Sequence, residues 1–171
     1  MNIFSTNECP KQSAREHSYR HVVKMILEYH QLLSTAHRIL DGDDYADPQG
    51  LYKATHKNHP SSTWSRESSY HYKWLFVMLC ELHKIYEAHT AKTHASKRIL
   101  KALGKLPENI HDNGFVMPTP AMPDKFKAVA IFHGRAVAYQ EYLKEKFQEW
   151  TCRDKPLEVY FPCGVPDWYK A

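Results

Sequence analysis

Apolar residues recur along this chain mainly at steps of three and four, which is helical spacing, and strand-like alternation is weak. Two stretches, 17–40 and 74–82, are apolar over most of their circumference and are therefore expected inside the fold. Prolines and glycines divide the rest of the chain. The pattern predicts helices over 13–40, 63–90, 93–105 and 125–150, an extended loop over 106–124 and an irregular tail over 151–171.

Helix boundaries follow from capping residues. Ser13, with Glu16 three residues later, has the pattern of a capping box at the start of the first long helix. Pro60 excludes a continuous helix through the segment before it, and Gly104 suits the end of the short basic helix. No internal repeat divides the chain. We therefore predict a mainly α, compact, single-domain fold over residues 1–171.

One polar stripe interrupts the apolar surface of the first predicted helix. His17, His21, Lys24, Glu28 and Gln31 follow each other at steps of four, three, four and three, so they share one narrow face. Such a stripe can simply face water. A solvated stripe, however, is usually richer in mixed lysine and glutamate pairs. The other interpretation is the wall of a polar cleft, with Glu28 as acid or base and the cations holding an anion such as phosphate.

His17 and His21 also stand at the i, i+4 spacing of two metal-binding histidines. No glutamate lies between them, and Arg20 would oppose a divalent cation. The sequence therefore predicts no metal site, and no cofactor.

Three further groups offer contacts to an anionic partner. Arg66, Tyr70 and Lys73 share one helical face behind a serine-capped helix start, where free N–H groups favour phosphate. A basic run without acids includes Lys97, Arg98 and Lys101. For both groups the alternative is an exposed, solvated helix face. We also expect the polar stripe of the first helix to meet the face of Arg66 and Tyr70 at one cleft, with Glu28 and at least one of His17 and His21 facing Arg66 or Tyr70.

The chain closes on an aromatic pair followed by a cation, at Trp168, Tyr169 and Lys170. These residues either contact a nucleic acid or dock onto the protein's own surface.

Composition narrows the class of protein. The 171 residues are 43% hydrophobic, with no stretch long enough for a membrane span and no signal-peptide pattern, so we expect a soluble cytoplasmic protein. The net charge of +4 permits a nucleic-acid partner without requiring one. Aromatic residues make up 13% of the chain, more than a core of this size needs, and they suit stacking on bases or packing at an interface.

Together these features resemble the phage pyrimidine-dimer DNA glycosylases of the endonuclease V type, which are also AP lyases. The resemblance rests on a start without a leader, an early helix with His17 and Glu28, the His-Pro turn at 59–60 and the closing "WYK" at 168–170. The segments "HVVKMILE" and "NHPSSTWSRES" are also similar to phage proteins of undefined activity. The resemblance implies double-stranded DNA as partner, a monomer, and the cytoplasm of a phage host.

In that family the N-terminal amine attacks C1′ of the damaged nucleotide to form a Schiff base, and a glutamate stabilises the sugar cation. Carried over, the amine belongs to Met1, or to Asn2 after methionine removal, and the carboxylate is Glu28. His17 matches the family's early histidine. Arg20 or Lys24 matches its phosphate-binding cations, and His21 is expected to join them.

Two departures leave alternatives open. Methionine removal is inefficient before a residue as large as Asn2, and a direct register places Lys24 where the family has its glutamate. Glu16 is therefore a second candidate carboxylate. The other functional hypotheses are a phage enzyme that modifies a pyrimidine on a glycosylase-like scaffold, and a non-catalytic module that binds DNA or protein.

Overall fold

The computed structural model describes residues 2–170, and over this range the chain forms nine α-helices and one 3₁₀ helix without a strand. The predicted mainly α fold is therefore confirmed. No helix within these residues combines the length and apolar character that a membrane crossing requires. The helices are α1 Pro10–Arg15, α2 Tyr19–Leu40, α3 Asp43–Ala46, α4 Pro60–Glu67, α5 Ser69–Thr90, η1 Ala95–Ile99, α6 Leu100–Leu103, α7 Asp124–His133, α8 Arg135–Thr151 and α9 Asp167–Lys170.

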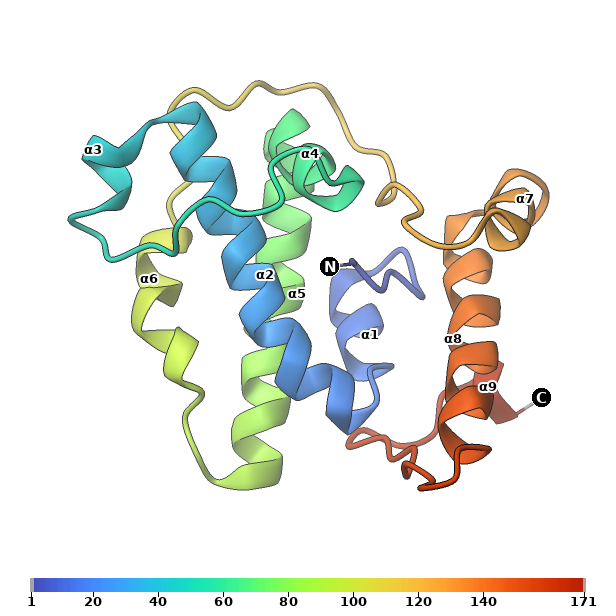
Figure 1. Cartoon of the computed structure of the whole chain (residues 1–171). Helices are drawn as coiled ribbons and strands as arrows, with labels where there is room; N and C mark the ends of the chain where they lie inside the picture. Colours follow the sequence, from blue (N-terminus) through green and yellow to red (C-terminus); the bar gives the residue numbers. More distant parts are fainter. Residues whose placement is uncertain (1, 171) are drawn as a thin grey trace.

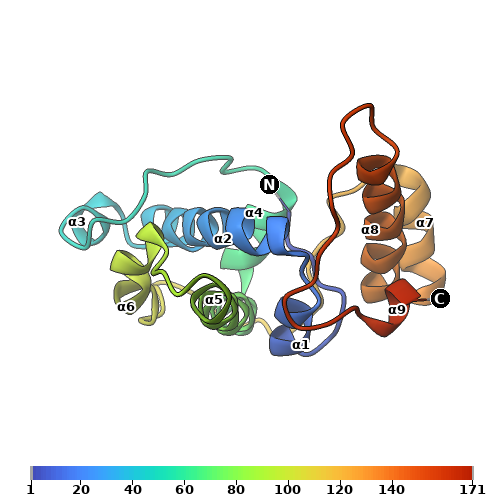
Figure 2. The same ribbon diagram turned by 90° about the horizontal axis from the view of Figure 1, so that it is seen from below.

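The two long helices, α2 and α5, lie side by side, with α6 on one side and the α7–α8 hairpin on the other (Figure 1). Helix α2 packs on α5 and α4, α1 packs on α5, and α7 packs on α8. Seen from below, α1 lies between the α2–α5 pair and α8 (Figure 2). The predicted packing of the two long helical segments is confirmed.

Buried apolar side chains form one continuous cluster. Helix α2 is buried over much of its surface, and the apolar centre of α5 is buried as predicted. The cluster extends to α8 and includes Ile3 and Phe4 of the N-terminal segment. The buried residues of α2, α5 and α8 in it are Val22, Met25, Ile26, Tyr29, Leu32, Leu33, Ala36, Tyr72, Trp74, Leu75, Met78, Leu79, Leu82, Ile85, Ala138, Tyr139, Leu143, Phe147 and Trp150.

The prediction of a single helix over 13–40 is wrong, because the helix is interrupted before Tyr19. Ser18 is extended, and the Tyr19 N–H donates to the carbonyl of Tyr160 at 2.7 Å instead of to the preceding helix turn. Ser13 is not a cap but lies inside α1, where its hydroxyl pairs with the backbone of Asn7. Contacts from distant segments thus override the local capping pattern.

Two more predicted helices are each divided in two. Helix α4 begins at Pro60 and not at 63, and residues 51–59 before it form no helix, as predicted. The extended Ser68 separates α4 from α5, with its hydroxyl bonded to the Gly114 carbonyl at 2.6 Å. Gly134, at φ +89°, separates α7 from α8, a backbone conformation that favours glycine. The segment 106–123 is irregular, and the short basic helix ends at Gly104, as predicted.

Candidate functional site

Residues 2–6 form an irregular segment buried between α2 and α8. Over 2–6 every residue is buried. The Phe4 N–H donates to the Tyr29 hydroxyl of α2 at 3.2 Å, and Gln140 of α8 donates to the Thr6 carbonyl at 2.8 Å. This segment therefore acts as the spacer that holds the two helices apart.

A cavity of about 550 Å³ opens where the segment separates the helices. Residue 2, helix α2, the loop before α7 and helix α8 all contribute to its wall. The lining residues are Asn2, Phe4, Arg20, His21, Lys24, Met25, Glu28, Ala121, Tyr142, Lys146, Trp150, Arg153 and Leu157. We call it the Glu28 cavity.

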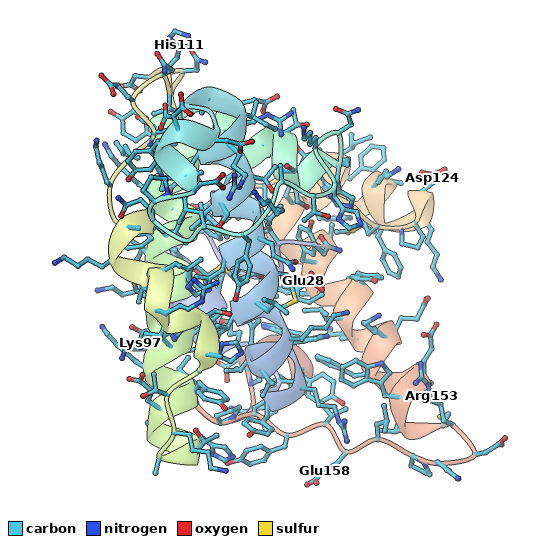
Figure 3. All side chains as sticks on the ribbon, turned by 60° about the vertical axis from the view of Figure 1, so that its left-hand side comes forward. Glu28, Lys97, His111, Asp124, Arg153 and Glu158 are labelled. Carbon is cyan, nitrogen blue, oxygen red and sulfur yellow. The ribbon has the colours of Figure 1, made fainter. Side chains whose placement is uncertain are left out.

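Of the described residues that line this cavity, Glu28 alone is acidic, and four are cations. The Glu28 side chain is 14% exposed and lies 3.4 Å from Lys24 Nζ, whose side chain is 70% exposed. Arg20 lies on α2 with Lys24, whereas Lys146 and Arg153 line the opposite wall, on α8 and in the turn after it. In Figure 3 Glu28 lies between the α6 side of the molecule, marked by Lys97, and Arg153 beyond α8. The arrangement suits an anionic ligand that reacts beside one carboxylate.

Aromatic rings form the apolar part of the wall. The His21 ring lies 4.5 Å from that of Phe4 and 5.0 Å from that of Trp150, between ring centroids. Burial lowers the pKa of His21 well below its usual value, and nearby Lys146 and Lys24 act in the same direction. His21 is therefore neutral at physiological pH. It lines the cavity as a largely buried polar ring, and its contact with a phosphate stays a prediction.

His17 does not share the stripe with His21, because the helix is interrupted before α2 and the His17 side chain is buried in the core. Its ring nitrogens lie 2.7 Å from the Ser13 carbonyl oxygen and 3.2 Å from the Tyr29 hydroxyl. Burial lowers its pKa to about 4. His17 does not line the Glu28 cavity, so this geometry does not support the predicted catalytic or phosphate-binding role. Its ring contacts Tyr29, whose hydroxyl accepts from the Phe4 N–H of the N-terminal segment.

The two candidate carboxylates occupy different sites. Glu16 is buried, with one oxygen accepting from the Trp168 indole N–H at 3.0 Å and the other from Gln12 at 3.0 Å. It does not line the Glu28 cavity. The geometry therefore favours Glu28 over Glu16 as a reactive group.

The C-terminal aromatic pair packs on the protein itself. Besides the bond from Trp168 to Glu16, the Tyr169 ring lies 5.6 Å from that of Phe147, between centroids. Lys170 pairs with Asp167 at 2.9 Å. Docking onto the protein's own surface thus describes Trp168 and Tyr169, and the proposed DNA contact by this pair is not supported.

The predicted meeting of two polar stripes is not observed. Among the described residues that line the Glu28 cavity, neither Arg66 nor Tyr70 occurs. Arg66 bonds to Ser62 of its own helix at 3.1 Å, and Lys73 lies over the Tyr70 ring, 5.5 Å from its centroid. This face is thus a separate surface and not part of the cavity.

The basic run on η1 and α6 is partly neutralised. Lys97 pairs with Glu87 at 2.5 Å, and Arg98 donates to the Gly50 carbonyl at 2.8 Å. Lys101 is exposed. Figure 3 shows Lys97 on the opposite side of Glu28 from Arg153. This run is therefore a different surface from the cationic wall of the cavity.

Met1, the first candidate for the nucleophile, lies outside the described residues. Asn2, the second, is buried and lines the Glu28 cavity. Within residues 2–170 no group of three or more His, Cys, Asp or Glu side chains is arranged to hold a metal ion.

Helix α8 and the turn after it supply cavity-lining residues that sequence reasoning missed. Tyr142, Lys146, Trp150 and Arg153 follow at steps of four, four and three, so they present one face to the cavity. The same periodic signal marks the stripe on α2. On α8 many apolar residues lie between the cavity-lining positions, so the sequence is typical of an ordinary core helix and the polar face is not apparent.

The chain was compared with known proteins. No family model, curated protein or solved structure matches it. Functional inference therefore depends on the geometry of the Glu28 cavity and on the sequence resemblance.

Proposed function

We propose that this protein is a DNA glycosylase with AP-lyase activity that acts on a damaged or modified pyrimidine in double-stranded DNA. One observation carries the proposal: Asn2, next to the chain start, and Glu28 line a single cationic cavity. An amine nucleophile and a carboxylate beside it are the two groups that Schiff-base glycosylase chemistry needs.

In the proposed reaction the neutral N-terminal amine attacks C1′ of the target nucleotide. The new N–C1′ bond forms as the glycosidic C1′–N bond breaks, and the base leaves with the bonding electrons and takes up a proton. The attached nitrogen then loses one proton, and the C1′–O4′ bond breaks with O4′ taking up a proton. The sugar is then held as a protonated Schiff base, an iminium ion that keeps one N–H. Removal of a C2′ proton then expels the 3′ phosphate. An α-amine suits the first step because part of its population is unprotonated near pH 7.

Glu28 is proposed to stabilise the positive charge that develops at the sugar. Its low exposure supports this role, since a carboxylate in a water-poor site acts more strongly on nearby charge than one in bulk water. The cations Arg20, Lys24, Lys146 and Arg153 would hold the flanking phosphates. Tyr142, which lines the cavity and is half-buried, is proposed to contact an unstacked base, whereas His21 and Trp150 are buried beneath it as part of the wall.

Borohydride trapping tests the proposal directly, because hydride adds to the iminium carbon and leaves a covalent enzyme–DNA adduct. We expect the unmodified protein to form an adduct with an abasic or pyrimidine-dimer duplex. Glu28→Gln should keep its affinity for DNA and lose roughly 10²–10³-fold in rate. Glu16→Gln is the matched control, because it changes a buried glutamate outside the cavity.

Peptide mapping of the adduct identifies the nucleophile. We expect the sugar remnant on the N-terminal peptide; attachment at Lys24 would make that side chain the nucleophile and contradict the amine assignment. A short, non-removable extension before Met1 should abolish trapping, because it converts the amine to an amide. If the protein binds DNA but forms no adduct with either substrate, the base-modification or binding hypothesis replaces the glycosylase.

A further inference from the structure

Asn2 is held by an unusually complete set of side-chain hydrogen bonds. Its Oδ1 accepts from the Tyr139 hydroxyl of α8 at 2.7 Å and from the Ile3 N–H at 3.0 Å, and its Nδ2 donates to the Ala121 carbonyl at 2.9 Å. The Ala121 N–H in turn donates to the Tyr139 hydroxyl at 3.4 Å. Asn2, Tyr139 and Ala121 thus form a closed triangle of bonds, which we call the Asn2 clamp.

The clamp joins three parts of the chain that meet at the Glu28 cavity. Asn2 and Ala121 line the cavity, whereas the Tyr139 side chain lies behind them, fully buried. Burial raises the pKa of the Tyr139 hydroxyl, so that it remains a donor. Tyr139 is therefore placed to act on the cavity only through its two partners.

We propose that Tyr139 is a positioning residue: through Asn2 it fixes the start of the chain at the Glu28 cavity. This inference rests on the proposed function for its catalytic consequence. Its structural content, that the hydroxyl immobilises residue 2, is independent of that function.

The clamp restrains residue 2, which the other bonds of the segment do not do. Those bonds join the backbone of Phe4 to α2 and the backbone of Thr6 to α8, further from the chain start. The bonds to Asn2 restrict the residue next to the terminus. Because a displacement of about 1 Å at a reacting group can lower a rate by about 10²-fold, loss of this restraint should affect chemistry far more than binding.

Tyr139→Phe is the test variant, because it removes one buried hydroxyl and keeps the ring. Tyr72→Phe is the matched control: Tyr72 is equally buried, and its hydroxyl donates to the Leu103 carbonyl at 3.0 Å on the far side of α2. Thermal unfolding should show similar destabilisation in both variants. Mass spectrometry confirms that each variant keeps the same N-terminal residue.

Two readouts then separate positioning from stability. At saturating abasic duplex, Tyr139→Phe should form the borohydride adduct roughly tenfold to a hundredfold more slowly than Tyr72→Phe, with an unchanged Kd for DNA. Without DNA, an aminopeptidase should release the first residue of Tyr139→Phe several times faster than that of Tyr72→Phe, below the unfolding transition.

The outcomes are distinct. If both variants trap and are digested at the same rates, the clamp does not position the terminus and the inference is overturned. If the unmodified protein forms no adduct, the proposed function fails; faster digestion of Tyr139→Phe would then still support the clamp, and equal digestion would overturn it as well.

Discussion

The cationic wall of the Glu28 cavity makes a quantitative prediction for DNA binding. Lys146→Ala combined with Arg153→Ala removes two charges from α8 and the turn after it, without touching Glu28. The Lys146 ammonium lies 5.6 Å from the Tyr142 ring centroid, and neither cation is part of the buried core, so the fold should persist. The perturbation is therefore mainly electrostatic.

The magnitude follows from counterion release. Each DNA phosphate that the protein no longer neutralises lowers the steepness of log K against log salt by about 0.9, so two of them lower it by about 1.8. Over a fourfold rise in salt, from about 50 to about 200 mM, the affinity advantage of the unmodified protein should then shrink about tenfold. Fluorescence anisotropy with an abasic duplex at four salt concentrations measures both quantities.

The matched control is Lys97→Ala with Lys101→Ala, on the opposite side of Glu28. Because Lys97 is already paired with Glu87, this variant should lower the steepness by less than the cavity variant does. An unchanged slope for the cavity variant would contradict the assignment of DNA to this wall. A larger decrease in the control would move the binding face to η1 and α6.

Three further predictions concern stability. Burial lowers the pKa of His30 and His83 to about 4, so the unfolded chain binds their protons below 6.5 and the folded protein does not. Urea unfolding should therefore show nearly constant stability above about pH 6.5 and a loss of about 2 kcal/mol for each of these histidines by about pH 5; glutamine at both positions should reduce the loss by about 4 kcal/mol, and the part that remains comes from other buried histidines such as His17. Gly134→Ala, at φ +89°, should lose about 1–3 kcal/mol through backbone strain alone, because an added Cβ would have no neighbour within 4 Å; thermal unfolding measures the loss. Trp168→Phe should lose about 1 kcal/mol with its bond to Glu16 and leave DNA affinity unchanged, and weaker DNA binding would restore the tail as a DNA contact.

The helical segments could be predicted where the apolar pattern continues over many residues. The interruptions between consecutive helices could not. The breaks at Ser18 and Ser68 depend on partners far away in sequence, the Tyr160 and His111 carbonyls, to which the next N–H groups donate. Nothing local in the chain signals those partners. Gly134 is different, because a glycine within a helical pattern is a signal that sequence reasoning can use.

The stripe predicted to line a cleft does so at His21, Lys24 and Glu28 but not at His17 or Gln31, and the residues predicted for the other wall do not line the cavity. The opposite wall was expected from Arg66, whereas it comes from α8. Helical spacing shows which residues share one side of a helix, but not which other helix packs opposite that side. Here the buried N-terminal segment decides the pairing, and its five residues carry no periodic signal.

That segment also links stability to the proposed chemistry. Ile3 is fully buried and Phe4 nearly so, and burying two such side chains stabilises the fold by roughly 3–6 kcal/mol. The same residues space α2 from α8 and carry Asn2 into the cavity. Residues 2–6 are part of the core, so they have lost their conformational freedom during folding and need not be ordered again when a ligand binds. Under the proposed function, changes that loosen this segment should therefore lower reactivity before they unfold the protein.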